Sequence, residues 1–256
     1  MSLLQVKDLS ISFGGVKAVD GVSFTVEPGE VFTLVGPNGA GKSTIFNLIS
    51  RLYEPSAGQI VFDGQDITGL PAHKVAGLGI ARTFQNIELF DHSSVLQNLL
   101  IGRHCRRNTR WFEELLFLHK VRRSERQHRL LVEEVIDFLE LAAYRDKLIA
   151  GLPYGVRKVV EIARALSSAP KLILLDEPAA GLSVEETQNM AWWNEDMQRE
   201  LGLTVLMVEH DMSLVSRVSN RVLAVSEGRP LAMGTAAEVQ ADPKVIGAYL
   251  GTEATS

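Results

Sequence analysis

The stretch of this sequence with the clearest chemical pattern runs from Gly36 to Thr44 and reads GPNGAGKST. It matches G-x-x-x-x-G-K-[ST], in which glycines let backbone N–H groups surround phosphate oxygens and the lysine adds a positive charge. The apolar run from Val31 to Val35 predicts a short buried strand before it, and the residues after Lys42 predict a helix. Because a helix N-terminus attracts anions, this stretch is predicted to bind the phosphates of a nucleoside triphosphate.

The residues of this loop have distinct predicted roles. Lys42 is expected to reach the β- and γ-phosphates, Ser43 to bind Mg²⁺ through its hydroxyl, and Thr44 to help hold the α-phosphate. A glycine-rich turn with a chance lysine is the alternative, which the flanking strand and helix disfavour. The other predicted nucleotide-binding residues of the loop are Gly36, Asn38, Gly39, Ala40 and Gly41.

Two adjacent acids end the apolar stretch LILLDEP, which runs from Leu172 to Pro178 and predicts another buried strand. In a protein with a phosphate-binding loop, Asp176 is expected to hold Mg²⁺ through water. Glu177 is expected to polarise the water that attacks the phosphate. Two acids in an ordinary turn would be the alternative, and the loop at 36–44 disfavours it.

Two further polar residues follow predicted strands. Gln85 ends the stretch GIARTFQ and enters a loop, at a place suited to reach Mg²⁺ and the γ-phosphate, although a loop glutamine is often only solvated. His210 follows the strand TVLMV and Glu209, at a strand end of the kind where α/β sites gather. It is expected to contact the γ-phosphate, with a capping or surface histidine as the alternative.

Composition bounds the class of protein. The 256 residues are 46% hydrophobic, which is ample for a core, and the formal net charge of −5 gives no indication of nucleic-acid binding. The single cysteine, Cys105, excludes an internal disulfide and fits a reducing compartment. No signal peptide is recognised at the N-terminus, and no run of about 18 apolar residues predicts a membrane span.

Strands and helices alternate along much of the chain, which predicts an α/β fold with a mainly parallel core sheet and helices on both faces. Residues 3–26 instead predict antiparallel strands joined at Phe13-Gly14-Gly15. A short helix is expected at 71–77 with Pro71 in its first turn. A longer helix is expected at 184–201, with one buried stripe of apolar residues. That stripe comprises Met190, Trp193, Met197 and Leu201.

A basic stretch interrupts this pattern within a helical region predicted from Ser94 to about Ala143. Residues 103–129 carry nine Lys or Arg against three acids, with Trp111 and Phe112 among them. A solvated helical face around a small core is one interpretation. A surface close to anionic lipid headgroups or to a membrane partner is the second, and nucleic acid is the least favoured.

Five stretches, in this order, resemble the ATP-binding subunit of ABC transporters over essentially the whole chain. They are the loop at 36–44, Gln85, the LPYG stretch at 152–155, LLDEP and VEHDM. The segments FGGVKAVDGVSF, GIARTFQN, AAGLS and the ending VIGAYLG are more closely similar to LivG-type ATPases of branched-chain amino acid importers. An importer for urea, amides or aromatic compounds is the alternative within the same class.

The resemblance implies a P-loop NTPase fold of the ABC ATPase type across residues 1–256. It implies an N-terminal antiparallel β subdomain, a helical subdomain inserted at about 90–165 and a C-terminal helical extension at about 236–256. It also implies ATP and Mg²⁺ as ligands and a role for Phe13 in stacking on adenine. The implied catalytic residues are Lys42, Gln85, Glu177 and His210, and the implied metal ligands are Ser43, Gln85 and Asp176.

The family's partners follow from the same resemblance. Two ATPases sandwich two ATP molecules head to tail, closure drives two integral-membrane permease subunits, and hydrolysis resets them. A substrate-binding protein acts indirectly, no nucleic acid is involved, and the ATPase lies peripherally on the cytoplasmic face of the inner or plasma membrane. The second ATPase is a similar subunit or a second copy. The signature residues that would act on the partner's ATP are Leu152, Pro153, Tyr154 and Gly155.

Three residues depart from the generic family pattern. Pro153 replaces a signature serine, Val156 replaces a glutamine, and Ser183 stands where Asp or Asn is usual. Each change removes or alters a polar group beside the ATP, which leaves open whether the two ATP sites are equal. Two other classes share the phosphate-binding loop. A small-molecule kinase has no use for the signature stretch, and an ABC ATPase acting on DNA or ribosomes usually carries two cassettes or a coiled-coil insertion.

Overall fold

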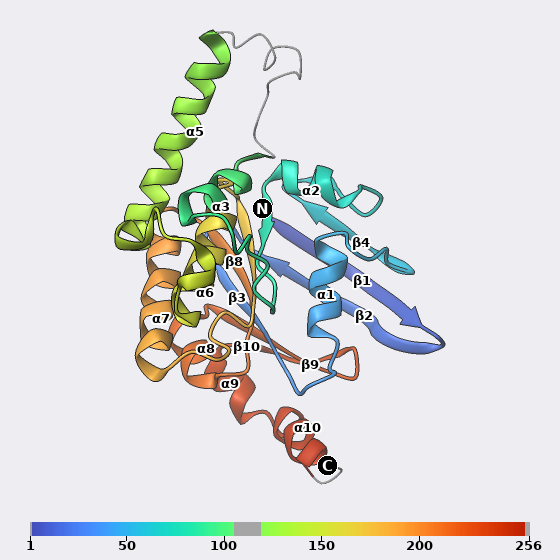
Figure 1. The fold of residues 1–256 in the computed structure, drawn as a ribbon. Coiled ribbons are helices and arrows are strands. Elements are labelled where there is room, and N and C mark those ends of the chain that lie inside the picture. Colours follow the sequence, from blue (N-terminus) through green and yellow to red (C-terminus); the bar gives the residue numbers. More distant parts are fainter. Residues whose placement is uncertain (1, 105–118, 254–256) are drawn as a thin grey trace. The chain divides into compact units, whose positions relative to one another are not determined.

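The computed structural model describes residues 2–104 and 119–253 and divides the chain into two compact units (Figure 1). The first unit combines residues 1–85 with 171–256, and the second comprises residues 86–170. Most of the basic stretch, with Trp111 and Phe112, lies outside the described residues. Among the helices that are described, none has the length and apolar character needed to cross a membrane.

The first unit contains an antiparallel sheet with the strand order β2-β1-β4-β5. The β1–β2 hairpin turns at Gly14 and Gly15, whose φ angles of 55° and 87° suit glycine because it has no Cβ. The predicted N-terminal antiparallel strands are therefore confirmed. The bounds are β1 Leu4–Phe13, β2 Val16–Val26, β4 Ala57–Phe62 and β5 Gln65–Asp66.

The second sheet of this unit has the order β10-β9-β3-β8-β7-β6, and its strands are parallel except for β10. Strands β3, β7 and β8 are buried at every position, because helices or the other sheet cover both faces, and so they read as continuous apolar runs. Since the parallel strands share one direction, their carboxyl ends meet at one edge. The bounds are β3 Val31–Val35, β6 Ile80–Arg82, β7 Leu172–Asp176, β8 Thr204–Val208, β9 Arg221–Ser226 and β10 Arg229–Gly234.

The two faces of the parallel sheet bury different residues of the same strands. On β9, Leu223 and Val225 join the core that contains helix α1 and the antiparallel sheet, whereas Val222 and Ala224 face the C-terminal helices. Helices α8, α9 and α10 lie together at the red end of the chain (Figure 1). The helices of this unit are α1 Lys42–Ile49, α2 Ala72–Leu78, α7 Val184–Arg199, α8 Met212–Val218, α9 Ala236–Ala241 and α10 Pro243–Glu253.

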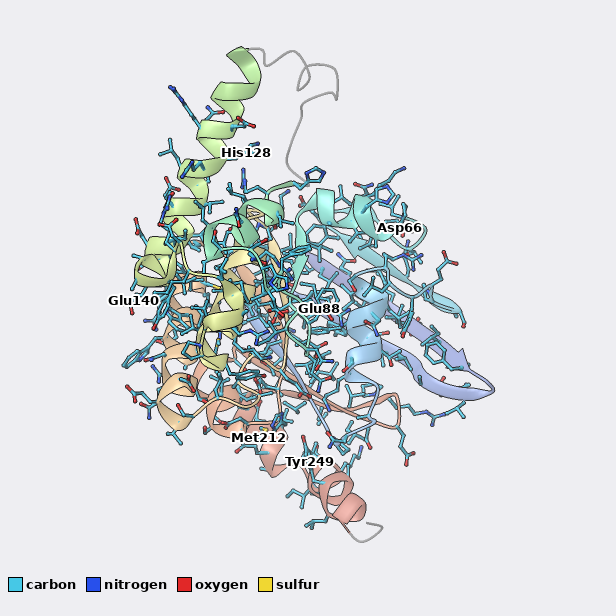
Figure 2. The ribbon with its side chains drawn as sticks, viewed as in Figure 1. Asp66, Glu88, His128, Glu140, Met212 and Tyr249 are labelled. Atoms are coloured by element: carbon cyan, nitrogen blue, oxygen red, sulfur yellow. The ribbon has the colours of Figure 1, made fainter. Side chains whose placement is uncertain are left out.

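An apolar cavity of about 250 Å³ lies between β3 and the C-terminal helices. Val35, at the end of β3, lines it together with Met212 from α8 and Tyr249 from α10. Figure 2 labels Met212 and Tyr249 close to each other at this place. Burial raises the pKa of Tyr249, while a hydrogen bond with the backbone of Gly36 opposes that rise.

The second unit is helical in its described residues. Helix α3 approaches α6 so closely that a Cβ on Gly102 would lie 2.2 Å from the carbonyl oxygen of Arg164, so only glycine fits there. Val132 and Ile136 of α5 and the following Leu139 are buried. Most residues of α6 are buried as well. The bounds are α3 Val95–Gly102, α5 His119–Phe138, η2 Ala142–Tyr144, η3 Ile149–Gly151 and α6 Tyr154–Leu166.

Two local predictions need correction. Helical spacing predicts Leu201 on the buried stripe of a helix at 184–201, but α7 ends at Arg199 and Leu201 is 53% exposed. Gly202 follows with φ of 59°, a conformation that does not continue a helix. Pro71 does not lie inside the first helical turn but precedes it as the N-cap of α2. Met190 and Met197 are fully buried as predicted.

Candidate nucleotide site

The phosphate-binding loop lies between β3 and α1, as its sequence predicts. Gly36 has φ of 151°, and a Cβ there would lie 2.0 Å from the carbonyl oxygen of Val225. Gly41 has φ of 97°, and its Cβ would lie 2.4 Å from the carbonyl oxygen of Ala18. Both glycines are therefore required by backbone conformation and by close packing against β9 and β2. The side chain of Ser43, on the first turn of α1, is exposed and open to a ligand.

The ammonium group of Lys42 is folded back into the loop. Its Nζ donates to the carbonyl oxygens of Gly36 at 2.7 Å and Pro37 at 2.9 Å, and the residue is buried. Burial lowers the pKa of Lys42, whereas the negative charges of Glu177 and Asp176 oppose that decrease. The lysine charge is thus held at the loop and faces two acids.

Asp176 ends β7 and is paired with Arg82, which ends β6. The guanidinium Nη2 donates to Asp176 Oδ2 at 3.0 Å, and the two side chains are 10% and 3% exposed. Arg82 Nη1 donates to Asn47 Oδ1 at 2.6 Å and to Ser50 Oγ at 2.9 Å, which joins the acid to α1. Phe46 and Phe84 lie 5.7 Å and 5.1 Å from the guanidinium carbon, within the range of cation–π attraction.

Glu177 follows in a left-handed backbone conformation with φ of 49°. A non-glycine residue adopts that conformation at a cost of about 1 kcal/mol, and it turns the side chain away from the strand direction. Gln85 Nε2 donates to Glu177 Oε2 at 3.1 Å. The structure therefore brings together Gln85 and Glu177, which are far apart in the sequence, in front of the same sheet edge.

His210 is exposed on the loop between β8 and α8, with 60% of its side chain accessible. Glu209, beside it, is fully buried. Burial raises the pKa of Glu209, and hydrogen bonds from the backbone N–H groups of Ala179, His210 and Asp211 act in the opposite direction. Asp211 caps α8 by accepting from the N–H groups of Ser213 and Leu214.

Phe13 lies at the tip of the β1–β2 hairpin and is 46% exposed. Its ring meets that of Tyr53 edge to face, with centroids 5.3 Å apart. Tyr53 follows α1 and is also exposed, so the two rings form an accessible aromatic surface on the first unit. Such a surface is suited to stacking on a planar base.

The signature stretch belongs to the second unit. Pro153 is the N-cap of α6, which begins at Tyr154, and both side chains are exposed. Leu152 and Gly155 are buried. Arg157, one turn further, pairs with Asp91 at 3.3 Å. The stretch therefore presents the start of a 13-residue helix, an end that carries a partial positive charge.

Comparison with known proteins identifies the family. Residues 19–180 match the family model described as ABC transporter, and residues 229–255 match the one described as branched-chain amino acid ATP-binding cassette transporter. The chain belongs to the ABC transporter ATPase family. It is an ATP-binding subunit of that family and hydrolyses ATP in the service of transport.

Relatives of this ABC ATPase span almost its whole length. The high-affinity branched-chain amino acid transport protein BraF of Pseudomonas aeruginosa is 40% identical over 97% of this chain and 98% of its own length. LivG of Escherichia coli, with the same described role, is 37% identical with the same coverage. The lipopolysaccharide export protein LptB of Haemophilus influenzae is 35% identical over 99% of both chains.

Solved structures confirm the fold of this ABC ATPase. A nucleotide-free ATP-binding cassette from an ABC transporter superposes with a TM-score of 0.85 at 31% identity, covering 97% of this chain and 99% of that one. An ATP-binding cassette in its ADP conformation gives the same TM-score and identity, covering 98% and 99%. The predicted mixed fold, with a mainly parallel core sheet and an antiparallel sheet, is therefore correct.

Sequence reasoning missed two charged residues of this ABC ATPase whose side chains are largely or fully buried, Arg82 and Glu209. Each stands beside a residue that was singled out, in GIARTFQ and in VEHDM. A charged residue at the end of an apolar strand indicates a charged or hydrogen-bonding partner nearby, because a charged side chain is seldom buried without one. The identity of the partner comes only from the sheet order, which places β6 beside β7.

Proposed function

We propose that this chain is the ATPase subunit of an ABC importer for branched-chain amino acids. The observation that carries the substrate class is the match of residues 229–255 to the model of branched-chain amino acid cassettes. Similarity over the ATPase core does not distinguish importers from exporters, since a lipopolysaccharide export protein is similar over the same length. The names of the BraF and LivG relatives support the same substrate class.

In this proposal the hydrolytic groups are Lys42, Gln85, Glu177 and His210. Lys42 exchanges its bonds to the carbonyls of the loop for the β- and γ-phosphates and offsets the charge that develops there. Glu177 orients and polarises the attacking water, and its hydrogen bond with Gln85 holds its carboxylate in front of the sheet edge. His210, exposed at the neighbouring strand end, contacts the γ-phosphate.

The donors present fit Mg²⁺. The Asp176 carboxylate and the exposed Ser43 hydroxyl are oxygen ligands, and Gln85 adds an amide oxygen. Within the described residues, no cluster of three or more His, Cys, Asp or Glu could hold a metal without other ligands. Mg²⁺ usually keeps several waters and is held by one or two carboxylates together with phosphate oxygens of the substrate. When bound, Mg²⁺ would neutralise charge on the phosphates.

The nucleotide is proposed to stack on Phe13 and to lie along the loop from Gly36 to Thr44. The start of α6, from Leu152 to Gly155, is proposed to act on ATP held by a second ATPase, either a similar subunit or a second copy. Two integral-membrane permease subunits and, indirectly, a substrate-binding protein complete the assembly. The ATPase would lie on the cytoplasmic face of the membrane.

The test begins with purification of the tagged chain from its own membranes under gentle conditions. Two multi-span membrane proteins and a second ATPase are expected to accompany it. The purified assembly, placed in liposomes with ATP inside and the external binding protein outside, should accumulate radioactive leucine or valine. Liposomes with Glu177→Gln assemblies serve as the control, because this variant should bind ATP without turning it over at a normal rate.

Three results would contradict the proposal in different ways. Accumulation of urea, an amide or an aromatic acid instead of leucine would refute only the substrate class. Recovery of ribosomes or DNA-bound proteins without membrane subunits would refute the role in an importer. Normal turnover by the Glu177→Gln assembly would refute the role of Glu177.

A further inference from the structure

Glu209 is a fully buried carboxylate to which the hydrolytic scheme gives no role. It lies directly after β8 and immediately before His210. A buried carboxylate requires several hydrogen-bond donors or a cation to offset the loss of water. The donors around Glu209 are backbone N–H groups, which fix the position of chain segments and bring no positive charge.

The two oxygens of Glu209 bind two different loops. Oε1 accepts from the N–H of Ala179 at 2.9 Å. Oε2 accepts from the N–H of His210 at 3.0 Å and, at a longer distance of 3.4 Å, from that of Asp211. One carboxylate therefore bridges the loop that follows β7 and the loop that follows β8, with one oxygen for each.

Both loops carry residues of the proposed hydrolytic site. Ala179 stands two residues after Glu177, whose N–H donates to the carbonyl oxygen of Val208 at 3.0 Å. His210 is the residue next to Glu209, and its Nδ1 lies 3.8 Å from Glu209 Oε2. The left-handed backbone at Glu177 is a conformation that persists only where its surroundings hold it.

We propose that Glu209 is a positioning residue that ties the loop after Glu177 to His210, so that the two catalytic side chains keep their relative places during hydrolysis. This inference rests on the proposed roles of Glu177 and His210. A carboxylate is suited to the task because both of its oxygens accept. Glutamine has the same shape but one accepting oxygen, so it can hold one loop and not both.

The substitution Glu209→Gln is therefore the sharpest test, in the full-length chain with Mg²⁺ and ATP. We expect kcat to fall roughly 10- to 100-fold, the range in which a misplacement of about 1 Å slows catalysis. The affinity for ATP should change less than about twofold, because the two oxygens of Glu209 accept from Ala179, His210 and Asp211, which lie outside the phosphate-binding loop. Glu209→Asp, which retains two accepting oxygens on a shorter side chain, should recover part of the activity.

Glu30→Gln is the matched control for the loss of a buried carboxylate. Glu30 is 7% exposed, pairs with Arg221 and accepts from the N–H of Glu27, just before β3 begins at the end opposite the phosphate-binding loop. This control should lower the unfolding temperature and leave kcat within about twofold of the unmodified chain. An equal loss of kcat in both variants would mean that Glu209 acts only through stability.

A double-mutant cycle with His210→Ala tests the coupling itself. If Glu209 acts by placing His210 against Glu177, then Glu209→Gln should lower kcat less than about threefold when His210 is already absent. Full additivity would overturn the inference, and so would unchanged kcat in Glu209→Gln alone. If the unmodified chain does not hydrolyse ATP at all, the proposed function fails instead, and the two failures are thus distinguishable.

Discussion

The buried ion pair between Arg82 and Asp176 gives the most direct test of how this site is held together. We expect Arg82→Met to destabilise the chain strongly in the absence of nucleotide. The change removes three hydrogen bonds, one of them the charged bond from the guanidinium to the Asp176 carboxylate, which is 3% exposed. Removal of one partner from a buried pair costs about 3–5 kcal/mol, because an uncompensated charge stays in the interior.

That loss of unfolding free energy corresponds to a large decrease in the unfolding temperature. A chain of this size loses roughly 2–4 °C of unfolding temperature per kcal/mol, so Arg82→Met should lower it by roughly 6–20 °C. Arg82→Lys keeps the positive charge, but one ammonium group cannot reach both Asp176 and the two acceptors on α1. It should cost about 1.5–3 kcal/mol, the range for hydrogen bonds that involve charged groups.

The assay is thermal unfolding followed by circular dichroism, with two controls. Arg51→Met removes another buried arginine, which donates to the carbonyl oxygens of Leu70 and Tyr53 and pairs with the exposed acid Glu54 at 3.7 Å. It should cost less than Arg82→Met, because no buried acid loses its partner. Adding Asp176→Asn to Arg82→Met should restore part of the lost stability.

Two results would refute this reasoning about the pair. If Arg82→Met shifts the unfolding temperature by less than Arg51→Met, the stranded carboxylate is not the main cost. Asp176→Asn could also destabilise the Arg82→Met chain by as much as it destabilises the unmodified chain. The two side chains would then contribute independently to stability. Either outcome would also contradict the view that Arg82 holds Asp176 in place beside α1.

Three further predictions follow from single residues. Lys42→Ala should lose most of the ATP affinity, measured by equilibrium binding of a fluorescent nucleotide, because Lys42 is the one basic residue in the sequence of the loop from Gly36 to Thr44. Gly36→Ala should abolish binding and lower stability by several kcal/mol, since its Cβ would meet Val225 at 2.0 Å; normal binding would contradict the packing described. For Asp66, hydrogen bonds from Gln59 and Thr68 lower the pKa from 3.8 to about 2. The ionised carboxylate therefore stabilises the fold at pH values above 3.8, its pKa in the unfolded chain, and this stabilisation is lost as the pH falls toward 2. The difference in unfolding temperature between the unmodified chain and Asp66→Asn should therefore be constant from pH 7 to 5 and narrow below pH 4, and a constant difference would contradict the assignment.

The sequence predicted the order of elements well because their signals are local. The apolar runs at 31–35, 172–176 and 204–208 are buried strands, and the loop from Gly36 to Thr44 lies between a strand and a helix. The failure at Leu201 has a local cause as well. Helical spacing counts an apolar residue as part of the stripe even when the backbone has already left the helix, as it has before Gly202.

The contacts that hold the site could not be predicted in the same way. Arg82 meets Asp176 because β6 lies next to β7 with Arg82 opposite Leu174, and no local pattern states which strands are neighbours. Glu209 reaches Ala179 for the same reason, since the parallel pairing of β7 with β8 brings the two strand ends together. The sequence gives the chemical type of each side chain, whereas the residue it pairs with is determined by the order of the strands in the sheet.

Both missed residues share a physical logic that bears on catalysis. Arg82 and Glu209 are charged groups buried at the carboxyl ends of β6 and β8, on either side of β7, which carries Asp176 and ends before Glu177. Each makes several directed hydrogen bonds from a rigid strand end: Arg82 joins Asp176 to α1, and Glu209 joins the loops that follow β7 and β8. If this is their role, Arg82→Lys should mainly weaken the binding of Mg²⁺, which depends on Asp176. Glu209→Gln should mainly lower kcat. In the double variant, the loss of Mg²⁺ affinity and the loss of kcat should each match that of the single variant, because the hydrogen bonds described for the two side chains go to different partners.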